Sequence, residues 1–407
     1  MDSSVTTKIP ASPNLKTAAA VPRIASVDAY RGFVMLLMMA EVLNFRHVSE
    51  SLPNSGFWSF LYHHQDHVAW VGTSLHDMIQ PSFSFLVGVA LPYSMASRIN
   101  KGGSFKSMLL AAMRRSLILI LLGIFLRSLH SDQTNFTFED TLTQIGLGYT
   151  FLFLLGYLGT KARVASLVIL LVAYWTAFAF YPLPGADFNY AAAGADPNWE
   201  HNLNGFAAHW NKNTNFAWNF DRWFLNLFPR ESPFLFNEGG YSTLSFIPTL
   251  GTMILGLLAG SELKSGSVAM KKIRYFLTIG FAIIVLGLII HLVGLNPIVK
   301  RIWTPAWTLF SGGLCFLFLS AFYYVIDIKQ YKRWAFFLTV IGMNSIAAYC
   351  LADGFSPFIV KSLYTHFGHY DMIFGDAYST LIKGAVVLTL EWLLLYWMYR
   401  KKIFIKI

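Results

Sequence analysis

The sequence predicts an all-α, polytopic integral membrane protein built as a bundle of about ten transmembrane helices. Hydrophobic residues make up 55% of the 407 residues and charged residues only 13%, whereas soluble domains carry roughly 25% charged residues. As a globule, such a chain could not cover a water-facing surface. The composition therefore excludes an ordinary cytosolic enzyme, a disordered protein and a disulfide-stapled secreted domain.

Ten apolar runs have about the 20 residues that a helix needs to cross roughly 30 Å of hydrocarbon. They cover residues 29–45, 78–97, 108–129, 141–159, 164–181, 241–261, 273–293, 304–326, 334–351 and 378–399. Helices are expected because lipid offers no hydrogen-bonding partner to the backbone of an open strand. A transmembrane barrel would instead show alternating segments of about ten residues.

The basic residues predict the orientation of these spans. If the N-terminus is cytoplasmic, 22 of the 31 Lys and Arg residues fall in cytoplasmic segments, as the positive-inside rule requires. Both termini are then cytoplasmic. Residues 1–22 form a flexible tail, and residues 23–407 form one transmembrane domain with long outer segments at 46–77 and 182–240. This distribution explains the net charge of +10 without a nucleic-acid partner.

The outer segment 182–240 is rich in aromatic residues, which argues against disorder. Its tryptophans include Trp199, Trp210, Trp218 and Trp223. They suit either an aromatic layer on the membrane interface or a lid over a substrate pocket.

Ionisable and amide side chains within the spans are candidate functional groups, because their burial in lipid is costly. Glu41 and Asn344 are the hardest to explain as structural residues. Arg115, near the start of the third span, could also reach the membrane surface by snorkelling.

The most concentrated polar chemistry lies in the stretch His63-His64-Gln65-Asp66-His67. Histidines at i and i+4 beside a carboxylate can bind zinc, but no further ligand motif follows, and we expect no metal. His67 lies ten residues before Asp77, which begins a predicted span. A histidine and a carboxylate that meet at the rim of a bundle can act as a general-base pair.

Several short motifs, taken in order, resemble the heparan-α-glucosaminide N-acetyltransferase family of transmembrane acyltransferases. The first is the stretch 23–32 before the first span, and the next begins with His67-Val68-Ala69-Trp70 and continues through Asp77, Pro81 and Phe83. Later motifs are Glu238-Gly239 with Pro248, Ile302-Trp303-Thr304, Asp327-Ile328-Lys329 and Gly342-Met343-Asn344-Ser345. Each motif is weak alone, but their shared order makes the set fairly specific.

The resemblance implies transfer of the acetyl group of cytosolic acetyl-CoA, as co-substrate, to an amino sugar on the far side of the membrane. It implies His67 as the catalytic base or acetyl carrier, with Asp77 and Asn344 beside it. Acceptor binding is then expected from four residues: Asn44, Glu41, Glu238 and Trp303. Arg31, Arg115 and Ser345 are expected to bind acetyl-CoA.

The same resemblance implies a homodimer, and we expect it in a bacterial inner membrane with the long segments in the periplasm. In the family an asparagine occurs two residues before the position of Asn44, so either Asn44 or Glu41 is expected to take that role. A transporter of amino sugars or N-acetylglucosamine is the alternative function. Intramembrane charges and an outer aromatic segment suit a transporter, whereas the absence of an inverted repeat argues against it.

Overall fold

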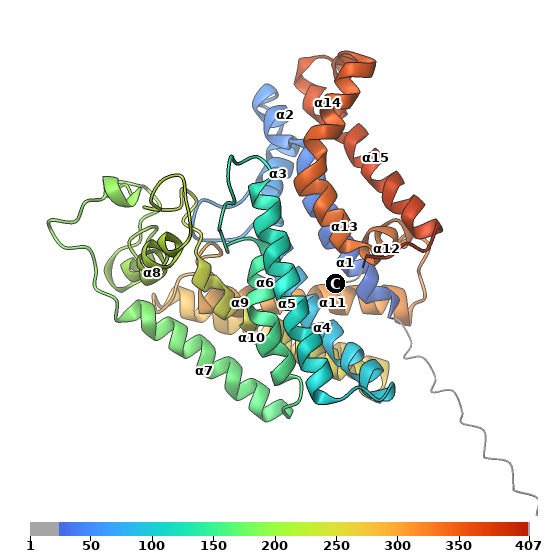
Figure 1. The fold of residues 1–407 in the computed structure, drawn as a ribbon, viewed down its shortest axis with the longest axis horizontal. Coiled ribbons are helices and arrows are strands. Elements are labelled where there is room, and N and C mark those ends of the chain that lie inside the picture. Colours follow the sequence, from blue (N-terminus) through green and yellow to red (C-terminus); the bar gives the residue numbers. More distant parts are fainter. Residues whose placement is uncertain (1–23, 406–407) are drawn as a thin grey trace, which may run out of the picture.

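The computed structural model describes residues 24–405, and these residues fold almost entirely into helices (Figure 1). The part of the chain that it describes contains no β-strand, only an isolated bridge between Val71 and Val299. The predicted tail, residues 1–22, lies outside the described residues. The all-helical class is therefore confirmed.

Twelve of the helices form the bundle. They are α1 (Ala25–Met39), α4 (Ile79–Asn100), α5 (Phe105–Ser128), α6 (Thr141–Leu155), α7 (Thr160–Ala179), α9 (Phe246–Lys264), α10 (Ala269–Leu292), α11 (Pro305–Phe322), α12 (Phe336–Met343), α13 (Ser345–Cys350), α14 (Ser356–Phe367) and α15 (Ser379–Arg400). The short helices α2 (Phe45–Ser51), α3 (Gly56–Gln65) and α8 (Phe216–Phe224) lie in the two long connecting segments.

Seven helical segments among the described residues are long and apolar enough to cross a membrane. They are Phe105–Ser128, Thr160–Ala179, Thr243–Lys264, Ala269–Leu292, Pro305–Ile328, Ser345–Phe367 and Asp376–Arg400. The protein is thus a multi-pass membrane protein by the length and composition of its helices. The count of ten spans and the cytoplasmic position of both termini stay predictions.

The expected span at 334–351 is placed differently from the prediction. The helix breaks at Asn344, whose backbone has φ −126° and ψ 42°, and the long apolar segment is Ser345–Phe367 instead. The side-chain amide of Asn344 donates to the Ile403 carbonyl (2.9 Å) and accepts from the Ile405 N–H (3.1 Å). These bonds to a distant segment hold the residue at a break that hydropathy alone does not show.

The centre of the bundle is α9, which packs against α4 with backbone in contact with backbone. A Cβ atom on Gly256 would lie 1.9 Å from the Phe85 carbonyl oxygen, and one on Gly260 would lie 2.3 Å from that of Val89. From the other side, a Cβ on Gly88 would lie 2.0 Å from the Met253 carbonyl oxygen. Glycines four residues apart let helices approach closely in a membrane. Any larger residue at these positions would force the two helices apart.

The segment 182–240 packs against the end of α7 through an aromatic cluster. Trp70 donates to the Trp210 carbonyl (3.1 Å), and the Trp210 ring stacks on Phe178 at an interplanar angle of 2°. Figure 1 shows the region around α8 on one side of the bundle and α14 with α15 on the other.

Candidate active site

His67 lies in the connection between α3 and α4, where its ring meets the carboxylate of Asp77. The distance from His67 Nδ1 to Asp77 Oδ1 is 2.7 Å. Asp77 belongs to a single helical turn, His76–Met78, directly before α4. Because a carboxylate only accepts, Nδ1 carries the hydrogen and Nε2 keeps its lone pair. The pair expected from the sequence is therefore formed in the structure.

Asp77 is fully buried and is held by hydrogen bonds on both oxygens. Its Oδ2 accepts from the Ser74 N–H (3.0 Å), the Ser74 hydroxyl (3.1 Å) and the Val68 N–H (3.3 Å). Burial alone would raise the pKa of this carboxyl, but the bonds from His67 and Ser74 and the charge of Lys300 outweigh it and hold the pKa well below its usual range. Asp77 is therefore a fixed anion that orients the His67 ring.

Lys300 completes the group from a segment 233 residues away in the chain. Its Nζ lies 3.3 Å from His67 Nε2, 3.1 Å from Nδ1 and 3.5 Å from Asp77 Oδ1. Because the Nδ1 hydrogen points to Asp77, the acceptor available to this ammonium is Nε2. Burial lowers the pKa of Lys300 to about 8, although Asp77 favours the charged form.

The surroundings of the His67 imidazole favour its neutral form. Burial lowers its pKa below the ordinary value, and the charges of Lys300 and Arg301 act in the same direction against the opposing effect of Asp77. The ring of His76 lies edge-on at 4.6 Å, and burial lowers the pKa of His76 to about 4. The His67 side chain keeps 31% of its surface exposed, so a neutral base remains accessible.

Arg301 fastens the two segments that frame this group. Its guanidinium donates to the carbonyls of Gly239 (2.9 Å) and Val68 (3.2 Å) and lies 5.2 Å from the centre of the Tyr241 ring. The connection that carries His67 is thereby tied to the end of the segment 182–240.

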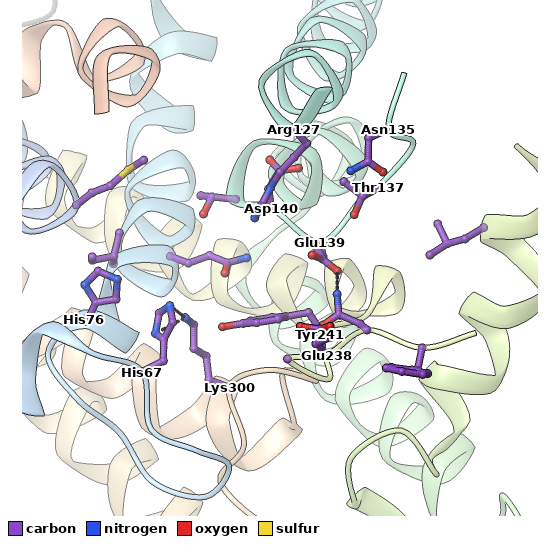
Figure 2. A pocket seen from close by; sticks show the side chains of 18 of the residues that line it. His67, His76, Arg127, Asn135, Thr137, Glu139, Asp140, Glu238, Tyr241 and Lys300 are labelled. Carbon is purple, nitrogen blue, oxygen red and sulfur yellow. Dashed lines mark hydrogen bonds between the residues drawn. The ribbon is translucent and has the colours of Figure 1, made fainter. Parts of the chain in front are cut away.

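The His67 group opens into a polar cavity of about 610 Å³ at one end of the bundle, shown in Figure 2. Its lining combines cationic and acidic side chains with aromatic ones. The cations are Arg127, Arg230 and Lys300, the acids include Glu41, Glu139 and Glu238, and Tyr241 and Tyr349 add aromatic rings. Glu139 accepts from the Asn237 side-chain amide (2.6 Å). Part of the wall, Leu225 to Gly239, comes from the segment 182–240.

Two proteins of known activity are similar in sequence to this chain. No family model matches the chain. It is 24% identical to the human protein described as heparan-alpha-glucosaminide N-acetyltransferase over 439 residues, 96% of the chain. It is also 24% identical to the mouse protein of that name over 434 residues, 95% of the chain. The chain resembles these N-acetyltransferases. The resemblance expected from the motifs is confirmed, and the chain spans about three fifths of each relative, 61% and 60% of their lengths.

The structure brings together some of the residues that the resemblance to the N-acetyltransferases suggested. His67, Glu41 and Glu238 line the cavity, and Asp77 lies directly behind His67. Asn44 lines a neighbouring hollow that also includes Glu41.

Trp303 is not part of this cavity. It is buried, and its indole N–H donates to the Thr252 hydroxyl (3.2 Å). This side chain therefore packs inside the bundle.

Asn344 is also separate from the His67 group. Its neighbour Gly342 packs against Asp28 and lies close to Gly32 on α1, whereas the His76 ring lies 3.9 Å from Glu41 at the far end of that helix. Gly32 and Glu41 are nine positions apart, which corresponds to about 13 Å of helix. The structure therefore does not bring Asn344 together with His67 and Asp77.

The three residues expected to bind acetyl-CoA lie outside the cavity lining as well. Arg31 forms an ion pair with Asp28 (3.4 Å), and Arg115 donates to the Tyr149 hydroxyl (3.2 Å) with its guanidinium over the same ring. Ser345 follows Asn344 at the break before α13.

Lys300, Arg127 and Arg230 are the site residues that motif reasoning missed. All three belong to the nine basic residues that remain on the outer side in the predicted topology. Basic residues that depart from the positive-inside distribution need another reason for their position. Here the three gather around one cavity, and this departure was the signal that could have found them.

Proposed function

We propose that the protein is a transmembrane acetyltransferase that transfers the acetyl group of acetyl-CoA to the amine of an amino sugar. The observation that carries this proposal is the His67 imidazole, held by Asp77 at 2.7 Å and exposed to a polar cavity. Its context is a chain that resembles N-acetyltransferases over 96% of its length.

His67 acts as the general base in this proposal. When the substrates bind, the Lys300 ammonium turns from Nε2 to the thioester oxygen, which frees the Nε2 lone pair. The acceptor amine then attacks the thioester carbon, its proton moves to Nε2, the new N–C bond forms and the C–S bond breaks. The proton on His67 then passes to the departing CoA thiolate. A base whose pKa lies near or below the working pH is present in the form that this step needs.

In this proposal Lys300, and not Asn344, stabilises the oxyanion of the reaction. Its ammonium lies beside His67 Nε2, where the tetrahedral intermediate would form. A fixed positive charge at this place stabilises the developing oxyanion. The lowered pKa of His67 follows in part from the same charge.

The acidic side chains suit a cationic acceptor. Glu41 and Glu238 line the cavity together with His67, and carboxylates bind an ammonium group by charge-assisted hydrogen bonds. The proposal also places the protein in a bacterial inner membrane as a homodimer. Acetyl-CoA is delivered from the cytoplasmic side, and the acceptor is periplasmic.

The test is acetyl transfer by the purified full-length protein, with acetyl-CoA and glucosamine as substrates. The variant His67→Ala is expected to lose at least a thousandfold in kcat, since it lacks the base. His63→Ala is the matched control, because His63 is exposed in the same polar stretch, does not line the His67 cavity and has its ring edge-on to that of His64.

Full activity of His67→Ala would refute the proposal. Uptake of N-acetylglucosamine into liposomes without acetyl-CoA would instead support the transporter.

A further inference from the structure

A second cavity adjoins the active-site cavity through shared residues. It measures about 940 Å³ and lies between the end of α1 and the helices α14 and α15. We call it the lateral groove. Met38 and Glu41 line both cavities, so a molecule in the groove has its end at the acceptor side of the His67 cavity.

The walls of the lateral groove combine apolar and charged side chains. Met39, Val42, Pro357 and Val360 supply apolar surface. Lys361 and Lys383 supply two cations from two different helices, and Asp353 lies near them on the turn between α13 and α14. Such a lining fits a ligand that has both a hydrocarbon part and an anionic group.

The two lysines are in unusual surroundings. Both lie within helical segments long and apolar enough to cross a membrane, Ser345–Phe367 and Asp376–Arg400. Among the described residues, neither ammonium has a hydrogen bond or an ion pair. A charged side chain within such a segment is costly unless it snorkels to the interface or binds a partner. Lys361 is six residues and Lys383 seven residues from the end of its segment, about 10 Å along the helix. Both lysines therefore start below the membrane surface, and a side chain that snorkels toward that end brings its ammonium toward the lipid phosphates.

The outer surface of the groove faces the region that lipid would occupy. Phe355 and Phe358, beside the groove on the same helical segment, are 53% and 70% exposed. Exposed aromatic side chains on an apolar span are expected to contact lipid tails. A ligand with a hydrocarbon chain could therefore enter from the side without leaving the bilayer.

We propose that the lateral groove binds the phosphate and hydrocarbon chain of a membrane-anchored acceptor, whose amine reaches Glu41 and the His67 cavity. Lys361 and Lys383 bind the phosphate, and the apolar walls bind the chain. This proposal rests on the proposed function and narrows its acceptor to an amine that is joined through phosphate to a lipid. Both an amino sugar linked through phosphate to an isoprenoid and phosphatidylethanolamine have this chemistry.

The first test measures binding and needs no catalysis. Delipidated full-length protein is titrated with dioctanoyl phosphatidic acid, which has the phosphate, and with dioctanoylglycerol, which lacks it. The double variant Lys361→Gln/Lys383→Gln is expected to bind phosphatidic acid at least tenfold more weakly, the loss typical of one or more charge-assisted hydrogen bonds. Lys361→Arg/Lys383→Arg should retain binding and confirms folding.

The control variant is Lys271→Gln/Lys401→Gln, which removes two exposed lysines elsewhere and should bind phosphatidic acid as the wild type does. Equal binding by wild type and the Lys361→Gln/Lys383→Gln variant would overturn the proposal. Displacement of phosphatidic acid by CoA would also overturn it, since the groove would then belong to the acetyl donor.

The second test compares acceptors and separates the two sources of the amine. Acetyl transfer is measured with glucosamine linked through phosphate to a farnesyl chain, with phosphatidylethanolamine and with free glucosamine. The anchored acceptor is expected to show at least a tenfold higher kcat/KM than free glucosamine, and only in protein with both lysines. If free glucosamine reacts as well and the lysine variants change nothing, the groove assignment fails and the proposed function stands. If no acceptor is acetylated while phosphatidic acid still binds, the proposed function fails alone.

Discussion

The two ends of α1 differ in how their polar side chains are used. At the end near Glu41, His67 and Lys300 meet at the wall of a cavity, where both can contact a ligand. At the end near Asp28, Asn344 uses both atoms of its amide on the backbone of Ile403 and Ile405. Both ends carry residues expected at the catalytic site, and only the first has the geometry of one. A polar side chain inside a bundle is thus a better candidate for function when it lines a cavity than when all its hydrogen-bonding atoms are used on the protein itself.

Asp77→Asn should give the largest effect on activity. The uncharged amide cannot stabilise the imidazolium that forms when His67 takes a proton. Only one of its two terminal atoms accepts, so it also cannot replace both carboxylate oxygens. The kcat should therefore fall by about a thousandfold or more. The kcat for acetyl transfer to glucosamine is measured. Glu50→Gln is the control, because this exposed carboxylate pairs with Arg46 (2.8 Å) and does not line the His67 cavity. Wild-type activity in Asp77→Asn would contradict this prediction and would show that the His67–Asp77 contact has no role in catalysis.

Lys300→Met should lower kcat by about one hundred- to a thousandfold, as the loss of one oxyanion donor does. Lys212→Met is the matched control, since Lys212 lies in the outer segment over the Trp199 ring and outside the His67 cavity. Equal losses in both variants would point to a general effect of charge in place of a specific one.

The pH profile of kcat/KM should be bell-shaped. Activity is lost as the pH falls through the pKa of His67, below its ordinary value of about 6.5, because the base becomes protonated. It is also lost as the pH rises through about 8, where Lys300 loses its charge. Lys300→Arg keeps the charge and should shift the alkaline limb upward. An unchanged alkaline limb in this variant would assign that limb to another group.

Asn344→Ala should leave kcat within about twofold of wild type and lower the free energy of unfolding by about 1–3 kcal/mol, because two hydrogen bonds of about 0.5–1.5 kcal/mol each are lost. Thermal unfolding and acetyl transfer are measured on the same preparation. A large loss of kcat without a loss of stability would return Asn344 to the catalytic site.

The smallest effect is expected for Trp303→Phe. This change removes the hydrogen bond to Thr252 and should lower the free energy of unfolding by about 0.5–1.5 kcal/mol. KM for the amino sugar should not change, and an increase of tenfold or more would show that Trp303 binds the acceptor.

The helices and the His67–Asp77 pair could be predicted from the sequence, because both depend on residues that are near one another in the chain. Apolar runs report burial or lipid contact directly, so most of the expected spans coincide with helices. His67 and Asp77 are ten residues apart and could be paired by position. Lys300 is 233 residues from His67, and the helix break at Asn344 depends on a segment about 60 residues further along. Contacts of this range follow from packing, which no local pattern encodes.

The glycine contacts between α4 and α9 make one side of the active site rigid, whereas the opposite side is built differently. Because backbone touches backbone there, the two helices cannot slide past each other without steric collision, and their separation would lose this close packing. Asp77 at the head of α4 is anchored to them. The opposite wall of the cavity comes from connecting segments. Accommodation of differently sized substrates is therefore expected to come from that wall, while the base keeps a constant position.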